Sequence, residues 1–572
     1  MSKRWPLALL VMIVVAGGWI RLQDLGPAPF FGDELDHYYA ASALNEDGRP
    51  LLPSGESYDR GRTYTAMVAL SLRFIDEPEV AARLPSALFG VAGLILFAFL
   101  ARAIGGGWAA VWGTLLLAVY PEAILQSRQS RFYTYQMVWG LVALYAGWRT
   151  IRPVELPVDS REPIVRTWMW AVVTIVAFAA ASSIQVTTLS VLLAWGLAVL
   201  LAAVQEWSRA GRGSWRTSPV ILLVASGVLV GLAGLAREAS RGMPMLDLAT
   251  FVPAWASQNP ADARTYLWAI ADVFPVVVPL LPLIFIGVGL RRSRGLAVFL
   301  ALWFGVPLLL HSIILPWKGE RYIFLAMPAL FIAAGISAAA ACEALFRVVQ
   351  ARLPGGSDPT NRAARGGAAI TIGLVSLALV VATPAVRRAT RPAPIQKDFR
   401  WRVAGQLIQA LPGAGLVPLG SSMGLPALFY LGRVDFVVGT DFLQRTSRQP
   451  APEADSLEAS GSSTAPTTGQ PGGQEGQRPP VIDWYSGVPV LTTPETIWQH
   501  HPEAARVILA VDGHRMRFGN VDPALMEALS QDAEELCQGQ CGDLSLYLLR
   551  RDAPQESMEG SPAGDPSDEN TG

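Results

Sequence analysis

The sequence predicts a polytopic α-helical membrane protein that continues into a C-terminal α/β domain outside the cytoplasm. Of its 572 residues, 51% are hydrophobic and only 16% are charged, whereas a soluble protein usually carries about 25% charged residues. Apolar stretches near the 18–20 residues that cross a bilayer recur through residues 1–386. Membrane lipids are therefore expected partners, and nucleic acid is not.

Eleven membrane crossings are expected, and the basic residues orient them. The crossings are predicted near residues 7–21, 84–103, 108–125, 134–150, 168–184, 187–204, 218–235, 267–289, 296–314, 322–341 and 368–386. Segment 64–75 is short and contains Arg73, so an interfacial helix is expected there. Most Lys and Arg clusters fall on one side if the N-terminus is cytoplasmic. Everything after about Arg387 then lies outside, and the expected location is the cell (inner) membrane.

The chain is expected to have a membrane domain, a soluble domain and an acidic tail. Residues 1–386 form the membrane domain, whose long first external loop spans 22–63. Residues 387–551 form the soluble domain, and its expected elements are strands at 434–438 and 507–511 and helices at 402–411 and 523–529.

Two segments are predicted to be disordered. Residues 445–480 are rich in Pro, Gly, Ser, Thr and Gln, and they interrupt the soluble domain. The acidic tail, 552–572, is similar in character. Neither segment can bury enough apolar area to offset the entropy lost on ordering.

Cys537 and Cys541 lie in the region expected outside, where an oxidising compartment favours a disulfide. Metal binding is the alternative, but no second ligand pair closes a tetrahedral site. The sequence favours the disulfide.

The first external loop places Gly32-Asp33-Glu34 directly after the first crossing, at the start of an expected short surface helix. Asp33 and His37 are neighbours on one face of that helix. Capping of the helix N-terminus by Asp33 is an alternative. A divalent metal held by Asp33, Asp36 and His37 is another.

Cations recur in the other external segments, where the positive-inside bias is broken. Their main residues are Asp59 and Arg60 in the first loop, Arg128, Arg131 and Tyr133 in the next turn, and Lys318, Arg321 and Tyr322 in a later one. External charges beside apolar spans usually face a polar cavity. Snorkelling to lipid headgroups and salt bridges to Glu122 or a loop carboxylate are the alternatives. Together the cations indicate a site for a phosphate attached to a lipid.

At these residues the chain resembles the GT-C fold glycosyltransferases, and more narrowly glycosyltransferase family 39, which includes protein O-mannosyltransferases and lipid A aminoarabinose transferases. The resemblance covers most of 1–386. It rests on Phe31-Gly32-Asp33-Glu34, on Tyr58-Asp59-Arg60-Gly61, on Ala82-Arg83-Leu84-Pro85-Ser86 through Gly90, and on the turns around Arg131 and Arg321. Two positions depart from the family pattern: Tyr133 stands where some members have an acid, and Arg60 where they have Lys.

The resemblance implies a transferase that moves a sugar from a polyprenyl-phosphate carrier to a lipid, glycan or protein acceptor outside the cytoplasm. Attack on the anomeric carbon from the face opposite the leaving group predicts that it is an inverting enzyme. Asp33 would be the general base, and Glu34 would orient the acceptor or assist. Arg60, Lys318 and Arg321 would hold the lipid phosphate, and the sequence adds Arg128 and Arg131. His37, Asp59, Tyr133 and Tyr322 would support the site. A transporter or flippase of lipid-linked sugars is the main alternative, and a structural membrane protein with a binding domain is a third.

Overall fold

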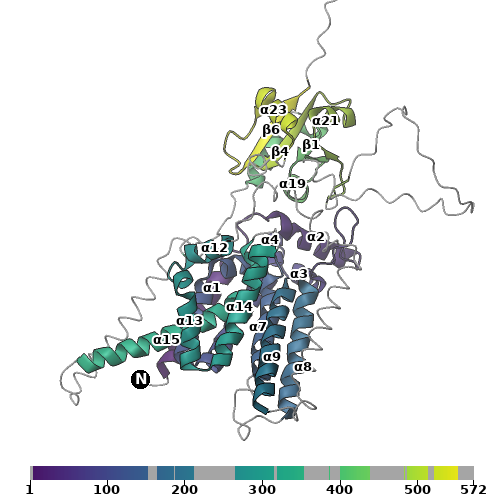
Figure 1. Cartoon of the computed structure of the whole chain (residues 1–572). Coiled ribbons are helices and arrows are strands. Elements are labelled where there is room, and N and C mark those ends of the chain that lie inside the picture. The colour runs from purple at the N-terminus through teal and green to yellow at the C-terminus, as the bar shows by residue number, and fades with distance from the viewer. Residues whose placement is uncertain are drawn as a thin grey trace, which may run out of the picture. The chain divides into compact units, whose positions relative to one another are not determined.

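The computed structural model describes residues 4–151, 164–185, 187–210, 264–314, 319–352, 386, 400–411, 413–438, 482–483, 486–512 and 521–551 (Figure 1). The chain forms two compact units, residues 1–396 and 397–572. Each unit is described by itself.

The regular elements described in the first unit are helices, apart from an isolated β-bridge between Leu51 and Ser57. Its helices are α1 (Arg4–Leu22), α2 (Gly32–Glu46), α3 (Arg62–Leu72), α4 (Pro78–Gly105), α5 (Gly107–Val119), α6 (Pro121–Ser127), α7 (Tyr133–Ile151), α8 (Ile164–Ile184), α9 (Thr188–Ala210), α12 (Thr265–Val273), α13 (Val277–Arg291), α14 (Arg294–Leu309) and α15 (Met327–Arg352). A π turn, Leu310–Ile314, follows α14, and a 3-10 turn, Glu320–Ile323, precedes α15. Helices α7, α8 and α9 lie side by side (Figure 1).

Five of the described helices are long and apolar enough to cross a bilayer, and two bent pairs raise the number to seven. The chain is thus a multi-pass membrane protein. The predicted crossing at 218–235 and all but the last residue of 368–386 lie outside the described residues, so eleven crossings stays a prediction. Helix α3 has 11 residues, about 16 Å, which is too short to cross the roughly 30 Å hydrocarbon core.

Two predicted crossings are sharply broken. Helices α5 and α6 meet at 61°, and α12 and α13 at 89°, so 108–125 and 267–289 are not continuous helices. At the first break Tyr120 is extended (φ −64°, ψ 116°) and Pro121 opens α6. A residue before proline is pushed away from helical geometry by the proline ring. The predicted crossing at 322–341 also begins late, because α15 starts at Met327.

Arg21, at the end of α1, satisfies the carbonyl groups that the first break exposes. Its guanidinium donates to Leu117 O (3.0 Å) and Ala118 O (3.1 Å), and also to Gly17 O (2.8 Å). In a continuous helix those two carbonyls would accept from residues 121 and 122, but Pro121 has no N–H group. Arg21 therefore joins α1 to the broken end of α5 while its own charge is hydrogen-bonded.

Helices α5 and α15 cross at close range through small residues. A Cβ at Gly335 would collide with the Ala109 carbonyl oxygen and the Gly113 nitrogen. Small residues at a crossing let two membrane helices pack backbone to backbone.

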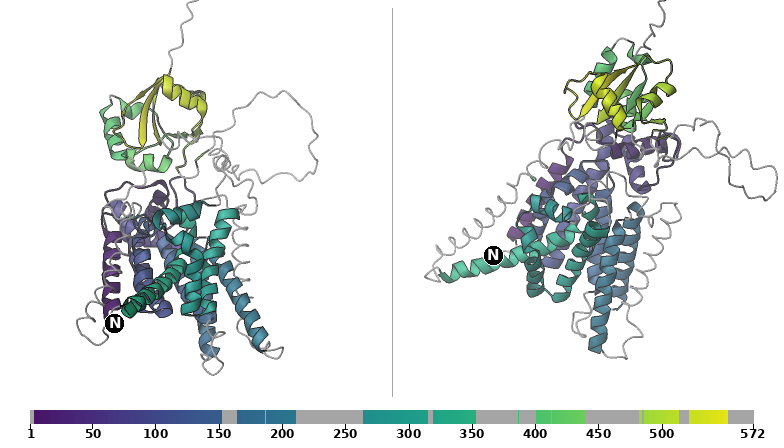
Figure 2. Two further views of the ribbon diagram at one scale, coloured as in Figure 1. Left: turned by 60° about the vertical axis from the view of Figure 1, so that its left-hand side comes forward. Right: turned by 45° about the horizontal axis from the view of Figure 1, so that its top comes forward.

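The second unit is an α/β domain, in which helices pack beside a sheet (Figure 2). The sheet has six strands in the order β3-β2-β1-β4-β6-β5. Its described elements are α18 (Trp401–Ala410), β1 (Leu419–Ser421), α19 (Gly424–Leu431), β2 (Phe436–Val438), β3 (Val490–Leu491), α21 (Pro494–His500), β4 (Arg506–Asp512), α23 (Pro523–Gln531), β5 (Ala533–Glu535) and β6 (Leu544–Arg550). Strands β1 to β4 pair in parallel, and β6 is antiparallel to β4 and β5. The strands and helices predicted near 402–411, 434–438, 507–511 and 523–529 are confirmed within three residues at each end.

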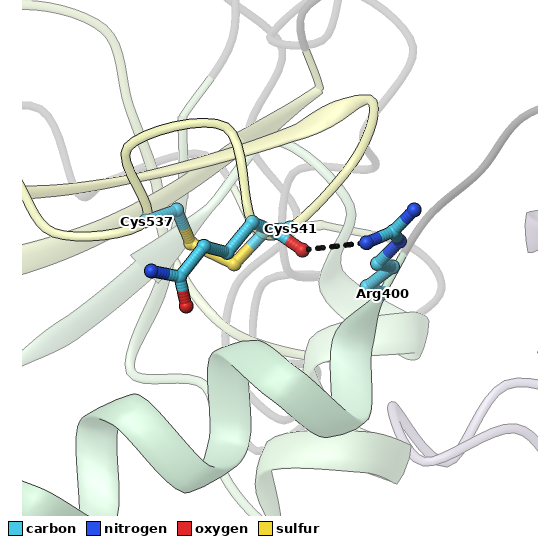
Figure 3. Close-up of a disulfide and its surroundings, with 4 residues drawn as sticks. Arg400, Cys537 and Cys541 are labelled. Carbon is cyan, nitrogen blue, oxygen red and sulfur yellow. Dashed lines mark hydrogen bonds between the residues drawn. A yellow bond between two sulfur atoms is a disulfide. The ribbon is translucent and has the colours of Figure 1, made fainter.

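Cys537 and Cys541 are joined in a disulfide in the connection between β5 and β6 (Figure 3). The Cys541 carbonyl accepts a hydrogen bond from the Arg400 backbone N–H at 3.1 Å, directly before α18. The Arg400 guanidinium donates to Gln540 O at 3.3 Å. The closed loop thus holds the start of the domain against its last hairpin. Both predicted disordered segments, 445–480 and 552–572, lie outside the described residues.

Candidate functional site

Helix α2 begins at Gly32, so Asp33 and Glu34 lie in its first turn, where carboxylates favour the helix dipole. Phe31 occupies the N-cap position, and its backbone N–H donates to Glu34 Oε2 at 2.8 Å. The alternative in which Asp33 caps this helix is therefore wrong. Glu34 accepts the bond at the helix end, and the Asp33 side chain is 45% exposed.

Glu34 is fully occupied by protein donors. Arg83 of α4 binds it with two parallel bonds, Nε to Oε1 (2.8 Å) and Nη2 to Oε2 (2.9 Å), and the Ser130 backbone N–H donates to Oε1 at 2.7 Å. With the Phe31 bond, each carboxylate oxygen accepts twice. The side chains of Glu34 and Arg83 are 2% and 3% exposed. This geometry argues against the expectation that Glu34 orients the acceptor or assists, because Glu34 ties α2, α4 and the turn after α6 together.

Arg83 also fixes the chain that leads into α2. Its Nη1 donates to Leu25 O and Ala28 O, both at 2.7 Å, and its Nη2 donates to Pro29 O at 2.9 Å. One guanidinium thereby sets the path of the loop from α1 to Asp33.

Ser86, one turn further along α4, holds the turn that carries Arg131. Its Oγ donates to Arg131 O (2.7 Å), accepts from Arg131 N–H (3.2 Å) and lies 2.6 Å from the Tyr64 hydroxyl. Arg83 and Ser86 therefore position Asp33 and Arg131 from a single helix. Site prediction from the sequence left both out, although the segment around them carried the family resemblance. The available signal was a serine three residues after an arginine at the entry to an apolar span.

Asp33 meets two of the predicted external cations. Its Oδ2 lies 2.6 Å from Arg131 Nη1 and 3.7 Å from Arg321 Nη1. Both ion pairs use Oδ2, so in the described part of the chain Asp33 Oδ1 takes no part in an ion pair. Two guanidinium groups and one carboxylate leave one net positive charge at this point.

The two arginines differ in burial and in their aromatic neighbours. The Arg131 side chain is 9% exposed, its guanidinium carbon lies 5.7 and 5.5 Å from the ring centres of Phe132 and Tyr133, and burial lowers its pKa. Arg321 is 37% exposed and donates to the Tyr322 hydroxyl at 3.3 Å. Arg131 is thus fixed, and Arg321 is the more accessible of the two.

The other predicted site residues are less closely tied to Asp33. Arg128 donates to Asp24 O at 3.4 Å. Asp59 is exposed and accepts from Arg62 Nε at 2.7 Å. Arg60 is exposed, and its charge acts on His37. Lys318 lies outside the described residues.

His37 is a fully buried side chain. Its Nδ1 lies 3.0 Å from Thr65 Oγ1, and its ring makes edge contacts with Tyr58, Tyr64 and Phe132. Burial, with a smaller effect of Arg60, lowers its pKa to about 3. Within the described ranges no three His, Cys, Asp or Glu residues are arranged to hold a metal, so the alternative of a metal held by Asp33, Asp36 and His37 is not supported there.

Gly61 brings the Arg60 segment against the Arg131 turn. Its φ of +58° is left-handed, and a Cβ there would lie 3.2 Å from the Phe132 ring. Glycine is the residue that adopts this conformation without strain, and it allows the close approach.

No protein-family model matches the chain, and no curated protein matches it in sequence. Its structure is similar to ArnT from Cupriavidus metallidurans bound to undecaprenyl phosphate, with a TM-score of 0.54 and 15% identity over 96% of this chain and 98% of that chain. The apo state of ArnT gives a TM-score of 0.52 at 16% identity, over 95% and 97% of the two chains.

A third solved structure is the oligosaccharyltransferase AglB from Archaeoglobus fulgidus, in complex with an inhibitory peptide and a dolichol-phosphate. It gives a TM-score of 0.50 and 13% identity, and the match covers 90% of this chain and 70% of that one. The fold is the GT-C fold of membrane glycosyltransferases, as the resemblance in sequence implied. The narrower resemblance to family 39 remains a resemblance.

Proposed function

We propose that this protein is a membrane glycosyltransferase that moves a sugar from a polyprenyl-phosphate carrier to an acceptor on the extracytoplasmic side. The observation that carries the proposal is Asp33, exposed in the first loop of a GT-C fold and flanked by Arg131 and Arg321. Two solved structures of this fold hold undecaprenyl phosphate and a dolichol-phosphate. The acceptor class is a lipid, a glycan or a protein.

Asp33 serves as the general base through Oδ1. The hydroxyl group of the acceptor gives its proton to this oxygen as it attacks the anomeric carbon. The bond from that carbon to the phosphate oxygen breaks, its electron pair stays on the leaving polyprenyl phosphate, and attack from the opposite face inverts the sugar carbon. The adjacent cations favour the ionised carboxylate that a base requires.

Arg131 and Arg321 have different electrostatic roles. Arg131 is buried and within 2.6 Å of Asp33, so it mainly orients the base. Arg321 is more exposed and 3.7 Å from Asp33, and it stabilises the charge that develops on the phosphate. Arg60, Arg128 and Lys318 contribute further positive charge along the path of the lipid phosphate, and Tyr133 and Tyr322 support the two guanidinium groups.

The same proposal orients the chain in the membrane. The N-terminus is cytoplasmic, and the loop bearing Asp33 and the domain from about residue 387 are extracytoplasmic, in the cell (inner) membrane. The distribution of Lys and Arg supports this orientation, as does the disulfide between Cys537 and Cys541.

The proposal is tested by giving the purified full-length protein a panel of polyprenyl-phosphate sugars and measuring the polyprenyl phosphate released. We expect release from one donor class and a product of inverted anomeric configuration. Movement of intact lipid-linked sugar across a vesicle membrane, with no release from any donor, would contradict the proposal and favour a transporter.

A further inference from the structure

Helix α6 presents two buried hydrogen-bonding side chains near Arg321 that the proposed chemistry does not use. Glu122 and Gln126 lie one turn apart, and Gln126 Nε2 donates to Glu122 Oε1 at 2.8 Å. Gln126 is 4% exposed, and within the described residues its Oε1 is buried without a hydrogen-bond donor. A buried acceptor without a donor is costly, so this oxygen needs a donor that comes from outside the described chain.

The surroundings of this pair are rich in acceptors. Helix α6 packs against the turn Glu320–Ile323, and Glu122 interacts electrostatically with Glu320 and with Arg321. Arg321 in turn reaches Asp33 Oδ2 at 3.7 Å. Glu122, which Gln126 contacts, therefore interacts with the cation assigned to the lipid phosphate, and Glu320 directly precedes that cation in the chain.

The break before α6 explains why polar groups occupy a segment that is otherwise apolar. Tyr120 and Pro121 end α5 and redirect the chain, so Glu122 and Gln126 lie on a separate seven-residue helix that leads into the Arg131 turn. In membrane transporters, broken helices commonly form substrate sites.

We propose that Glu122, Gln126 and Glu320 form a subsite that recognises the sugar carried by the lipid, by accepting hydrogen bonds from its hydroxyl groups. This rests on the proposed function. Sugar hydroxyls supply the donors that the subsite lacks. A bare phosphate offers mainly acceptors and is disfavoured beside carboxylates. The subsite therefore places the sugar end of the donor at α6 and leaves the phosphate end to Arg321.

The test compares two ligands on the purified full-length protein: polyprenyl phosphate and the polyprenyl-phosphate sugar that the protein binds most tightly. In Gln126→Leu we expect affinity for the sugar-bearing lipid to fall about 3–10-fold, as one neutral hydrogen bond is lost. In Glu122→Gln we also expect a fall of about 3–10-fold, because one acceptor oxygen becomes an NH2 group and its hydrogen bond with the sugar is lost. Affinity for bare polyprenyl phosphate stays within about twofold of wild type in Gln126→Leu. In Glu122→Gln it does not fall, because that variant removes a carboxylate near the phosphate site.

Gln136→Leu is the matched control. Gln136 is another buried glutamine of the membrane unit, but its amide already donates to Thr188 Oγ1 at 2.8 Å. Any general effect of replacing a buried glutamine should change the binding of both lipids alike in this variant. Thermal unfolding of each variant checks that it is folded.

If Gln126→Leu and Glu122→Gln lowered the affinity for both lipids equally, the proposed subsite would be wrong. Glu122 and Gln126 would then have a purely structural role. Unchanged binding of the sugar-bearing lipid would overturn the subsite too, with the amide oxygen satisfied by an ordered water. Because the readout is binding, it is independent of transfer. Selective loss of the sugar-bearing lipid in a protein that releases no polyprenyl phosphate would support the subsite and refute the transferase.

Discussion

Replacing Glu34 by glutamine tests whether Glu34 positions the site while its neighbour Asp33 performs the chemistry. The substitution keeps the shape of the side chain but removes its charge and turns one acceptor oxygen into an NH2 group. That group would face two of the four donors on Glu34, which come from Arg83, Ser130 and Phe31. The Arg83 guanidinium would remain buried with its charge uncompensated.

The magnitude follows from the burial of the pair. Breaking a buried ion pair by removing one partner costs about 3–5 kcal/mol, and at 2% and 3% exposure solvent does little to reduce this. We therefore expect Glu34→Gln to lower the stability of the membrane unit by about that amount. Asp33→Asn, at a side chain that is 45% exposed, should change stability far less.

The assay is thermal unfolding in detergent, run beside the release of polyprenyl phosphate. The double variant Glu34→Gln/Arg83→Met should recover part of the stability, since an apolar replacement of a buried pair is often tolerated. It should not recover activity, because Asp33 and Arg131 lose their common support. A Glu34→Gln protein as stable as wild type but inactive would refute this reasoning and return Glu34 to the chemistry.

Three further predictions follow from the same geometry. Arg321→Met should lower kcat by about 10²–10³-fold, and Arg321→Lys should stay partly active. Steady-state kinetics with varied donor concentration measure this, and an unchanged rate in Arg321→Met would remove Arg321 from the phosphate site. Arg21→Met should destabilise the protein by about 1–3 kcal/mol for each buried carbonyl left without a donor. Thermal unfolding measures this, with Arg102→Met at the end of α4 as the control. An unchanged melting temperature would contradict the role of Arg21 at the break. Burial lowers the pKa of His37 to about 3 in the folded protein. The stability that depends on the neutral His37 is therefore fully present above about pH 6.5, the approximate pKa of an ordinary histidine. As the pH falls below about 6.5, the protein loses up to about 1.4 kcal/mol of stability per pH unit. His37→Phe should flatten that pH dependence, and an unaltered profile would contradict the assignment.

The sequence predicts the parts of the site that depend on residues close together in the chain. Length and apolar content give the crossings, and basic residues that break the positive-inside bias point to Arg131 and Arg321. Their approach to the acidic loop, found at 2.6 and 3.7 Å from Asp33, was expected from the orientation of the spans alone.

The remainder depends on contacts between distant segments. Glu34 and Arg83 are 49 residues apart, and no local pattern shows that one carboxylate of an adjacent pair is buried while the other is exposed. The break at Tyr120 had a local signal in Pro121, but it lay inside an apolar stretch of membrane-spanning length. The acceptor groups of α6 became visible only when α6 was placed against the turn that bears Arg321.

The central claim is that Asp33 is the base of a sugar transfer, and release of polyprenyl phosphate by wild type and Asp33→Asn tests it most directly. Asp47→Asn, at the exposed far end of α2, is the matched control. We expect turnover by wild type and Asp47→Asn, and none by Asp33→Asn despite unchanged folding and donor binding. Equal release by Asp33→Asn and wild type would contradict the account.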